Sequence, residues 1–288
     1  MFEGEERVAG NTEEEIYEKL GLDYVEPELR ENRGELEAAR KGELPNPITL
    51  DDIRGDLHSH TTVTDGRDGL EEMARAAKER GYGYLTITDH SKHLRMVDGL
   101  DEKRLWEQME EIDHLNEELG GITVLKGIEV DILEDGSLDL PDDILEELDI
   151  VVCSVHHKFG LSEKKQTERI IGAMQNSNAN VIAHPTGRMI EERQPYDVDM
   201  ELMMEAAKEN GCFLELNANP NRLDLNDVYC KMAKEMGVKI SVSTDAHSTS
   251  GLGNMRFGIG QARRGWLEKK DVINTRTLKQ LKKLLKRG

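Results

Sequence analysis

Apolar and polar residues follow two different periods along the chain from residue 53 onward. Short apolar runs, typical of buried strands, lie at 53–58, 84–89, 123–131, 150–156, 180–184, 212–217 and 239–245. Between them, apolar residues recur at helical spacing over 69–80, 101–119, 162–176, 199–210 and 226–236, and a further short helix is expected at 141–147. Because strand and helix alternate without a linker, the pattern predicts one α/β domain built like a barrel.

Residues 1–50 fall outside this repeat and are predicted to form an appendage to a domain at 51–288. A short helix is expected at 12–20, where Thr12 and Glu15 have the spacing of a capping box. Further along, the chain is interrupted at Pro27, Gly34, Gly42, Pro45 and Pro47. A segment this short and this broken is not expected to fold as a domain of its own.

Composition and charge narrow the class of protein. With 288 residues, 37% of them hydrophobic, the chain can bury a sizeable core. No apolar run is long enough for a transmembrane helix and no signal pattern is present, so we expect no membrane partner. The cysteines Cys153, Cys212 and Cys230 lack metal-site spacing, which favours a reduced, cytoplasmic protein. A formal net charge of −20 argues against a general duplex-DNA binder.

Histidines and carboxylates gather at the C-terminal ends of the expected strands. Six of the 9 histidines lie there with three acidic residues: His58, His60, Asp65, His90, Glu129, His156, His184, Asp245 and His247. In a parallel barrel these ends open on one face, so the side chains would converge in one pocket. His58 and His60 point the same way, because they are two apart in a strand. Glu129 lies in an apolar strand, where a buried carboxylate needs a charged partner or a metal. Asp89 is expected to orient a ligand histidine.

Each motif alone has a plainer interpretation, because an isolated His-x-His or Asp-x-His is more often structural or exposed than a ligand. The coincidence of six strand ends favours a polynuclear metal site instead. Nitrogen and oxygen ligands without a thiolate suit Zn²⁺, Mn²⁺ or Fe²⁺, and nine ligands are enough for three divalent ions. Such a cluster lowers the pKa of bound water and holds phosphoryl oxygens, which predicts hydrolysis of a phosphoester substrate.

Residues beside these motifs are candidates for binding the substrate. Lys126, Arg188 and Arg222 could each bind a phosphate, although a solvated surface charge is an equally good interpretation of each. Asn217 and Asn219, at the end of the sixth strand, could hydrogen-bond a metal ligand or the substrate.

The series of motifs resembles one known family. His-x-His at 58–60, Thr-Asp-His at 88–90, Gly-x-Glu at 127–129, Ser-x-His at 154–156, His-Pro at 184–185 and Asp-x-His at 245–247 are together similar to the polymerase and histidinol phosphatase (PHP) domain. Segments 53–60, 216–220, 243–249 and 255–266 resemble the C-terminal PHP domain of bacterial and archaeal family X DNA polymerases. Residues 8–17 resemble the end of the polymerase module and the linker after it.

The resemblance implies a distorted (β/α)7 TIM-like barrel with a three-metal site at the C-terminal ends of the strands. Carried over to this sequence, the first ion takes His58, His60, Glu129 and Asp245. Glu129 bridges to a second ion held by His156 and His184, and the third takes Asp65, His90 and His247. The implied catalytic residues are Glu129, His156, His184 and Asp245. Family members cleave phosphoesters with Mn²⁺ or Zn²⁺, and polymerase-linked members act as 3′→5′ exonucleases or process 3′ ends.

Three functions stay open. The full-length resemblance favours a nuclease or 3′-phosphoesterase acting on single-stranded or 3′-end DNA. The acidic balance favours a small-molecule phosphatase such as a histidinol phosphatase. A non-catalytic module supporting a polymerase would be indicated by lost ligands, and none of the nine is lost. No nucleotidyl-transfer domain fits into 50 residues, so polymerase activity is not expected, although a separate polymerase module is a candidate partner.

Overall fold

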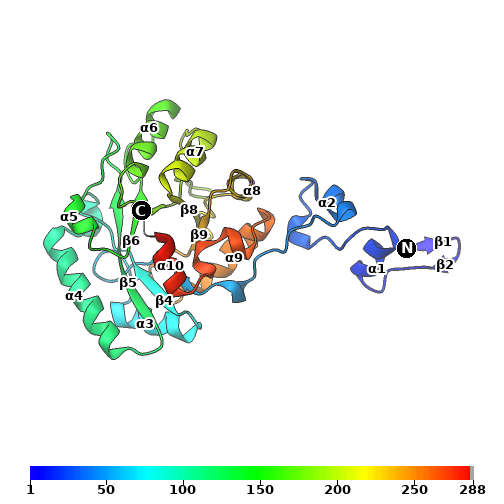
Figure 1. Cartoon of the computed structure of the whole chain (residues 1–288), viewed down its shortest axis with the longest axis horizontal. Coiled ribbons are helices and arrows are strands. Elements are labelled where there is room, and N and C mark those ends of the chain that lie inside the picture. The colour runs from blue at the N-terminus through cyan, green and yellow to red at the C-terminus, as the bar shows by residue number, and fades with distance from the viewer. Residues whose placement is uncertain (286–288) are drawn as a thin grey trace.

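The computed structural model describes residues 1–285 and contains one large parallel sheet. Its seven strands neighbour one another in chain order: β3 (Gly55–Asp56), β4 (Tyr84–Ile87), β5 (Thr123–Asp131), β6 (Ile150–Ser154), β7 (Val181–Ile182), β8 (Phe213–Asn217) and β9 (Ile240–Ser243). Each strand falls within an expected apolar run, and the predicted seven-stranded α/β barrel is confirmed (Figure 1). Because all neighbouring pairs are parallel, the strands end together at one opening, which we call the mouth.

Helices cover the outside of the sheet (Figure 1). They are α3 (Leu70–Glu79), α4 (Glu102–Glu118), α5 (Asp142–Leu145), α6 (Glu163–Met174), α7 (Met200–Asn210), α8 (Asp227–Met236) and α9 (Met255–Arg264). Asp101, Asp199 and Asn226 begin three of them, since each side chain accepts a hydrogen bond from the backbone N–H three residues later. The apolar faces of these helices and the outer face of the sheet form the larger hydrophobic core.

A second apolar cluster fills the end of the barrel opposite the mouth, which we call the lower end. It is formed by the inward-facing residues Leu57, Tyr84, Leu125, Ile150, Val152, Val181, Ala183 and Phe213. The helix α10 (Leu278–Leu285) adds Leu281 and Leu285 to this cluster. The C-terminal helix therefore seals the lower end with buried leucines, while the mouth stays polar.

The barrel is closed between β3 and β9 without a continuous strand ladder. At the mouth, the backbone N–H of His60 donates to the carbonyl oxygen of Ala246 at 2.9 Å. Lower down, the Asn274 side chain stands between the two edges and donates to the carbonyl oxygens of Gly55 (2.9 Å) and Val242 (2.7 Å). Its Oδ1 accepts from the Val242 N–H at 3.1 Å, and the Asp56 carboxylate accepts from the Thr244 N–H at 3.1 Å, so two buried side chains replace the missing ladder.

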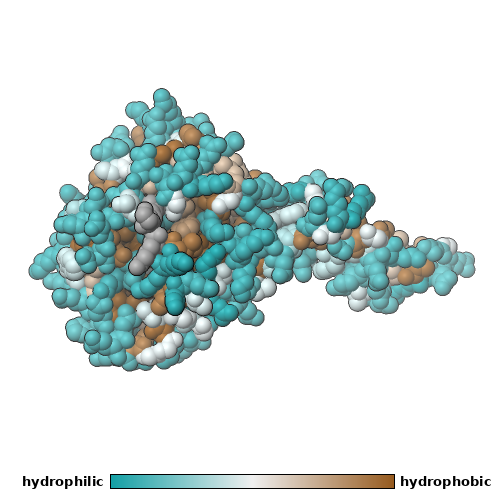
Figure 2. Space-filling model, in the orientation of Figure 1, coloured by the Kyte–Doolittle hydropathy of each residue, from teal (hydrophilic) through white to brown (hydrophobic). Residues whose placement is uncertain are grey.

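The appendage predicted at 1–50 has two parts. Residues 1–24 project from the barrel and hold the hairpin of β1 (Phe2–Glu3) and β2 (Glu6–Arg7) and the helix α1 (Glu13–Lys19) (Figure 1). The predicted cap of α1 is present, because the Glu15 N–H donates to Thr12 Oγ1 at 3.4 Å. The face shown in Figure 2 is mostly hydrophilic, with apolar atoms near the end of this projection.

Residues 25–48 lie against the barrel and carry α2 (Glu35–Lys41). Val25 and Leu29 are buried in a small cluster that Trp266 of the barrel joins. Arg263 pairs with Glu28 at 2.8 Å, which fixes the docked part beside α9. The domain boundary at residue 51 stays a prediction. Among the described residues, no helix is both long enough and apolar enough to cross a membrane.

Candidate metal centre

The nine predicted side chains lie together at the mouth, and Glu129 is at their centre. Its Oε1 is 2.9 Å from Nε2 of His184 and 3.4 Å from Nε2 of His156. Its Oε2 is 2.9 Å from Nδ1 of His90, 3.5 Å from Nε2 of His58 and 3.6 Å from Nε2 of His60. One buried carboxylate therefore contacts histidines that follow four different strands.

The two aspartates complete the cluster on either side of His60. Asp245 Oδ1 lies 3.1 Å from His60 Nε2, and Asp65 Oδ1 lies 3.7 Å from His60 Nδ1. Asp65 Oδ2 is also 3.2 Å from Nε2 of His247 and 3.4 Å from Nε2 of His90. Since His60 reaches both aspartates, the cluster is continuous rather than divided into isolated sites.

Three overlapping groups of these residues could each hold a metal ion, because their ligand atoms lie within 4.8 Å of one another. The groups are His58, His60 and Asp245; His90, Glu129 and His156; and His60, Asp65, His90 and His247. His60 and His90 each occur in two groups. The implied division of ligands among three particular ions therefore stays a prediction.

The hydrogen bonds of the histidines suit divalent cations. Within residues 1–285, the buried atoms His58 Nε2, His60 Nδ1, His90 Nδ1 and Glu129 Oε2 make no well-aligned hydrogen bond, although His90 Nδ1 and Glu129 Oε2 lie 2.9 Å apart. The opposite ring nitrogen of His58, Nδ1, is fixed by Glu215 (2.7 Å). Nδ1 of His156 and Nδ1 of His247 are likewise held, by Asp131 (3.2 Å) and by the carbonyl of Asp245 (2.8 Å). Metal-binding histidines show this arrangement, with one nitrogen hydrogen-bonded and the other free to bind an ion.

The electrostatics of the mouth also favour cations. Burial by itself lowers the pKa of His58, but the carboxylates of Glu215 and Glu129 raise it well above its ordinary value. Burial raises the pKa of Glu129, yet the imidazoles of His90 and His156 hold it well below its usual range. The carboxylates thus stay ionised only beside positive charge, which protons on the histidines or divalent ions can supply.

Glu215 and Asp131 were missed by the sequence analysis. Glu215, on β8 and fully buried, accepts hydrogen bonds from His58 Nδ1 and from the backbone N–H of His184 (2.7 Å). Asp131 follows Glu129 by two residues, faces the same side of β5 and contacts His156. Both are carboxylates inside apolar strands, so the reasoning that singled out Glu129 could have found them.

The asparagines and Arg222 lie at the edge of the mouth. The Asn217 amide donates to Asp245 Oδ2 (3.0 Å), and its Oδ1 accepts from the Asn219 N–H (3.0 Å). Asn217 therefore holds an acidic residue of the cluster. The oxygen of the Asn219 side chain accepts from the Asn221 N–H, which shapes the loop. Arg222 Nε is 3.4 Å from Asp245 Oδ2, and its buried Nη1 has no hydrogen-bond partner among the described residues.

Three expectations need correction. Lys126 is three residues from Glu129, so its side chain points to the opposite face of β5, where Nζ pairs with Asp113 of α4 at 2.6 Å. It therefore lies outside the mouth.

Arg188 donates from Nε to the carbonyl of Arg222 (2.7 Å) and from Nη2 to that of Leu223, so it supports a loop.

Asp89 does not orient a ligand histidine. Its carboxylate accepts hydrogen bonds from the N–H and hydroxyl of Thr61 (2.9 and 2.6 Å), the hydroxyl of Thr64 (2.6 Å) and the amide of Gln108 (2.7 Å). These contacts fix the turn that follows His60 and leads to Asp65. Asp89 thus acts on the backbone of the site rather than on an imidazole.

Comparisons with known proteins agree with this geometry. A model of the PHP domain family matches residues 56–219, and a model of the DNA polymerase beta thumb matches residues 1–31. The "DNA polymerase/3'-5' exonuclease PolX" of Bacillus subtilis is 44% identical over 278 residues, which cover 96% of this chain but 48% of the relative. The chain thus spans about half the length of that relative.

Two further proteins match the barrel. A Thermoanaerobacter protein (strain X514) named "Probable phosphatase" is 34% identical over 232 residues, covering 76% of this chain and 89% of the relative. A crystal structure of histidinol phosphate phosphatase from Lactococcus lactis, complexed with zinc, L-histidinol and phosphate, has a TM-score of 0.51 at 16% identity. It covers 73% of this chain and 94% of that one, and at this identity it supports the fold alone.

Proposed function

The chain belongs to the PHP domain family of metal-dependent phosphoesterases, and we propose that it hydrolyses phosphodiester or phosphomonoester bonds at 3′ ends of DNA, as a 3′→5′ exonuclease or 3′-end processing enzyme. One observation carries the hydrolytic part: in the described chain, buried ring nitrogens of His58 and His90 face Glu129, and His60 Nδ1 faces Asp65, without making hydrogen bonds. The match to the polymerase relative over 96% of the chain supports DNA as substrate.

The mouth is proposed to hold three divalent ions, Zn²⁺, Mn²⁺ or Fe²⁺, through the nine side chains. Bound ions would supply Lewis acidity and positive charge for the attack of water on phosphorus. Glu129 would hold ligand positions on both sides, because each of its oxygens faces a different set of histidines. Glu215 and Asp131 would fix His58 and His156 in the tautomer that leaves Nε2 for an ion.

Arg222 is the proposed phosphate-binding residue. Its side chain is only 16% exposed and carries a buried Nη1 without a partner among residues 1–285. A phosphate oxygen would satisfy this donor and offset its charge. Arg188 and Asn219 would act indirectly, since both hold the loop that carries Arg222. Asn217 would act through Asp245.

The proposed reaction needs no protein nucleophile. The hydroxyl of Ser59 donates to the backbone carbonyl of Thr86 at 2.7 Å, so it is committed to the fold. Ser154 lies 3.3 Å from His156 Nδ1, but that nitrogen also faces Asp131. A serine nucleophile needs an unoccupied base, and neither hydroxyl has one. We therefore propose direct, in-line attack by water.

A small-molecule phosphatase is the second candidate function. The zinc-containing structure of similar fold acts on histidinol phosphate by its name, and the net charge of −20 favours a small substrate over a long polyanion. A purely supporting, non-catalytic module is less consistent with the site, because every ligand-type side chain of the predicted nine is present and lies at the mouth.

Activity on three substrates decides between these functions. The chain is supplied with Mn²⁺ and tested on a single-stranded oligonucleotide, a 3′-phosphorylated oligonucleotide and histidinol phosphate. We expect turnover of one or both oligonucleotides, its loss in Arg222→Ala, and retained turnover in the control Lys126→Ala. Turnover of histidinol phosphate alone would establish the second candidate, and a metal-loaded chain inactive on all three would contradict the phosphoesterase assignment of this mouth.

A further inference from the structure

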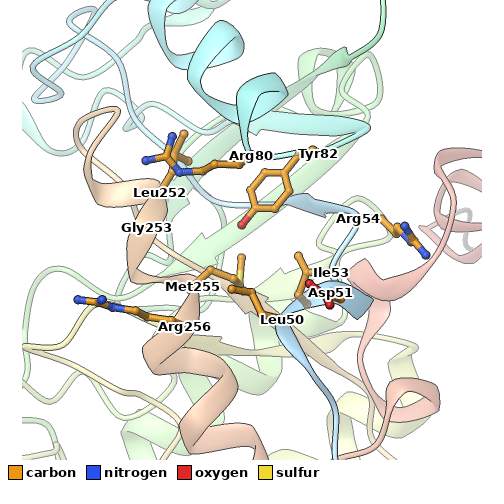
Figure 3. A pocket seen from close by; sticks show the side chains of 11 residues that line it. Leu50, Asp51, Ile53, Arg54, Arg80, Tyr82, Leu252, Gly253, Met255 and Arg256 are labelled. Atoms are coloured by element: carbon orange, nitrogen blue, oxygen red, sulfur yellow. The ribbon is translucent and has the colours of Figure 1, made fainter.

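A cavity of about 330 Å³ lies on the side of the barrel, between α3 and the turn Gly251–Asn254 that leads into α9 (Figure 3). Its inner wall consists of the buried side chains Ile53, Leu252 and Met255 and the ring of Tyr82. None of the nine side chains at the mouth lines it. Ligand pockets of roughly 300–1,000 Å³ are typical, so this cavity has room for a small organic molecule.

The Tyr82 hydroxyl provides a polar group inside the apolar wall. Tyr82 is 7% exposed, and its hydroxyl makes no hydrogen bond to any residue of the described chain, 1–285. In Figure 3 the hydroxyl points across the cavity toward Met255. The ring is buried but the hydroxyl oxygen opens into the cavity, where solvent reaches it, so this O–H can donate to a ligand.

Two arginines stand on one rim of the cavity. Arg80 donates from Nη1 to the carbonyl oxygen of Ala76 (2.9 Å), and it has no carboxylate partner among the described residues. Arg256 lies over the ring of Phe257 (4.6 Å to the centroid) and likewise pairs with no acid in the described part of the chain. In a chain of net charge −20, two exposed guanidiniums that form no ion pair within the described residues make a local anion-attracting rim.

The opposite rim differs. Asp51 and Arg54 line the cavity there, and Figure 3 shows the Arg54 guanidinium directed away from Tyr82, on the far side from Arg80 and Arg256. The cavity therefore has one cationic side, an apolar inner wall and a hydroxyl donor between them. This combination suits a molecule with an anionic group at one end and an apolar ring at the other.

We propose that this cavity is a second, non-catalytic binding site for a small phosphorylated molecule with a planar ring, such as a nucleoside monophosphate. Its phosphate would lie between Arg80 and Arg256. Its ring would lie against Leu252 and Met255, and Tyr82 would donate to an acceptor of the ligand. The site is distinct from the mouth, and its existence does not depend on the proposed reaction.

Binding of thymidine 5′-monophosphate to the metal-loaded chain, measured by isothermal titration calorimetry, tests the proposal. We expect a saturable component that persists in Glu129→Gln, in which the mouth is impaired. Arg256→Ala and Tyr82→Phe should each weaken that component at least tenfold. Tyr82→Phe removes only a hydroxyl and so preserves folding, and Arg75→Ala, on the exposed face of α3 outside the cavity, is the matched control that should bind like the unaltered chain.

Two smaller molecules show how much the nucleoside and the phosphate of the ligand each contribute to its affinity. Thymidine without phosphate and inorganic phosphate alone should each bind at least tenfold more weakly than the nucleotide. The proposal is overturned if no component persists in Glu129→Gln, or if Arg256→Ala and Tyr82→Phe bind as the unaltered chain does. Equal affinity for inorganic phosphate would also overturn it, because the apolar wall would then contribute nothing.

Discussion

At the mouth of the barrel the buried side chains include a cluster of imidazoles and carboxylates, whereas at the lower end they are aliphatic and aromatic. Both groups lie inside the same ring of strands. At the mouth, buried atoms such as Glu129 Oε2 are left without hydrogen-bond partners in the described chain, while at the lower end Leu281 and Leu285 fill the space with apolar contacts. The lower end therefore stabilises the barrel. The buried polar groups at the mouth lower the free energy of unfolding, and they are kept for the proposed chemistry.

Glu129→Gln should have the largest effect of these changes. It should lower the rate of hydrolysis while the protein stays folded. The amide keeps the shape of the side chain but removes the charge that faces five histidines. We expect hydrolysis to fall by about 10³-fold or more, equivalent to about 4 kcal/mol in the barrier. Steady-state turnover, metal content and the melting temperature are measured together. Near-normal turnover with full metal content would contradict the central role proposed for Glu129.

Leu281→Ala, at the lower end, should lower stability and leave activity unchanged. The side chain is fully buried where α10 seals the barrel, so its loss leaves a cavity. The free energy of unfolding should fall by about 2–5 kcal/mol, measured by denaturant titration. Activity per folded molecule should stay unchanged, with Lys279→Ala on the same helix as a surface control. A specific loss of turnover in folded Leu281→Ala would show that the two ends are not separable.

Glu215→Gln and Asp131→Asn should give an intermediate effect at the mouth. Each removes the charge that orients a histidine without removing a predicted ligand. Metal affinity, measured by competition with a chelator, should fall about 10–100-fold. Glu209→Gln, on the exposed face of α7, is the control. Unaltered affinity in both mouth variants would mean that the histidines are positioned by packing alone.

Metal-free protein should respond to pH more than metal-loaded protein. Burial lowers the pKa of His90, but Glu129 and Asp65 raise it to about 10, and Asp65 and Asp245 raise that of His247 to about 9 against burial. Protonation therefore stabilises the metal-free fold fully below about pH 6.5, and this stability is lost as pH rises through 9 to 10. The gap between the two melting temperatures should widen from pH 6.5 to 9. A constant gap would contradict this.

Deletion of residues 1–24 should have the smallest effect, because they project away from both ends of the barrel. Turnover and melting temperature should stay near those of the full chain. Deletion of 1–50 should also preserve turnover but lower the melting temperature, since it exposes Trp266 and unpairs Arg263 from Glu28. Loss of turnover in a folded deletion would show that the appendage reaches the mouth.

The sequence predicted the positions of all seven strands because apolar runs of buried parallel strands are distinct from helical periodicity. It was less accurate on length. The run at 180–184 became the two-residue strand Val181–Ile182, since His184 turns away with a positive φ of 29°. The run at 53–58 became Gly55–Asp56, because Asn274 replaces the ladder at that edge.

The sequence predicted that the nine site residues converge, because each follows or ends an expected strand and the positions of the strands can be found from the sequence pattern. The error on Lys126 was avoidable, because side-chain alternation already placed it on the face opposite Glu129. The roles of Arg188 and Asp89 were not accessible in this way. Both depend on backbone groups of distant loops, and no periodicity in the sequence reports where those loops lie.

The junction that Asn274 makes between β3 and β9 also affects when the barrel can close during synthesis. Asn274 joins the two edges of the barrel, and 219 residues separate it from its partner Gly55. A ribosome that has released β3 through β9 has not yet released Asn274, so the lower part of the junction between the first and last strands is still open. His60 and Asp245 lie on opposite sides of that junction and are 185 residues apart, so a nascent chain cannot complete its metal-binding group until β9 and the residues that follow it have left the exit tunnel. Metal acquisition is thereby postponed until nearly the whole barrel has been translated.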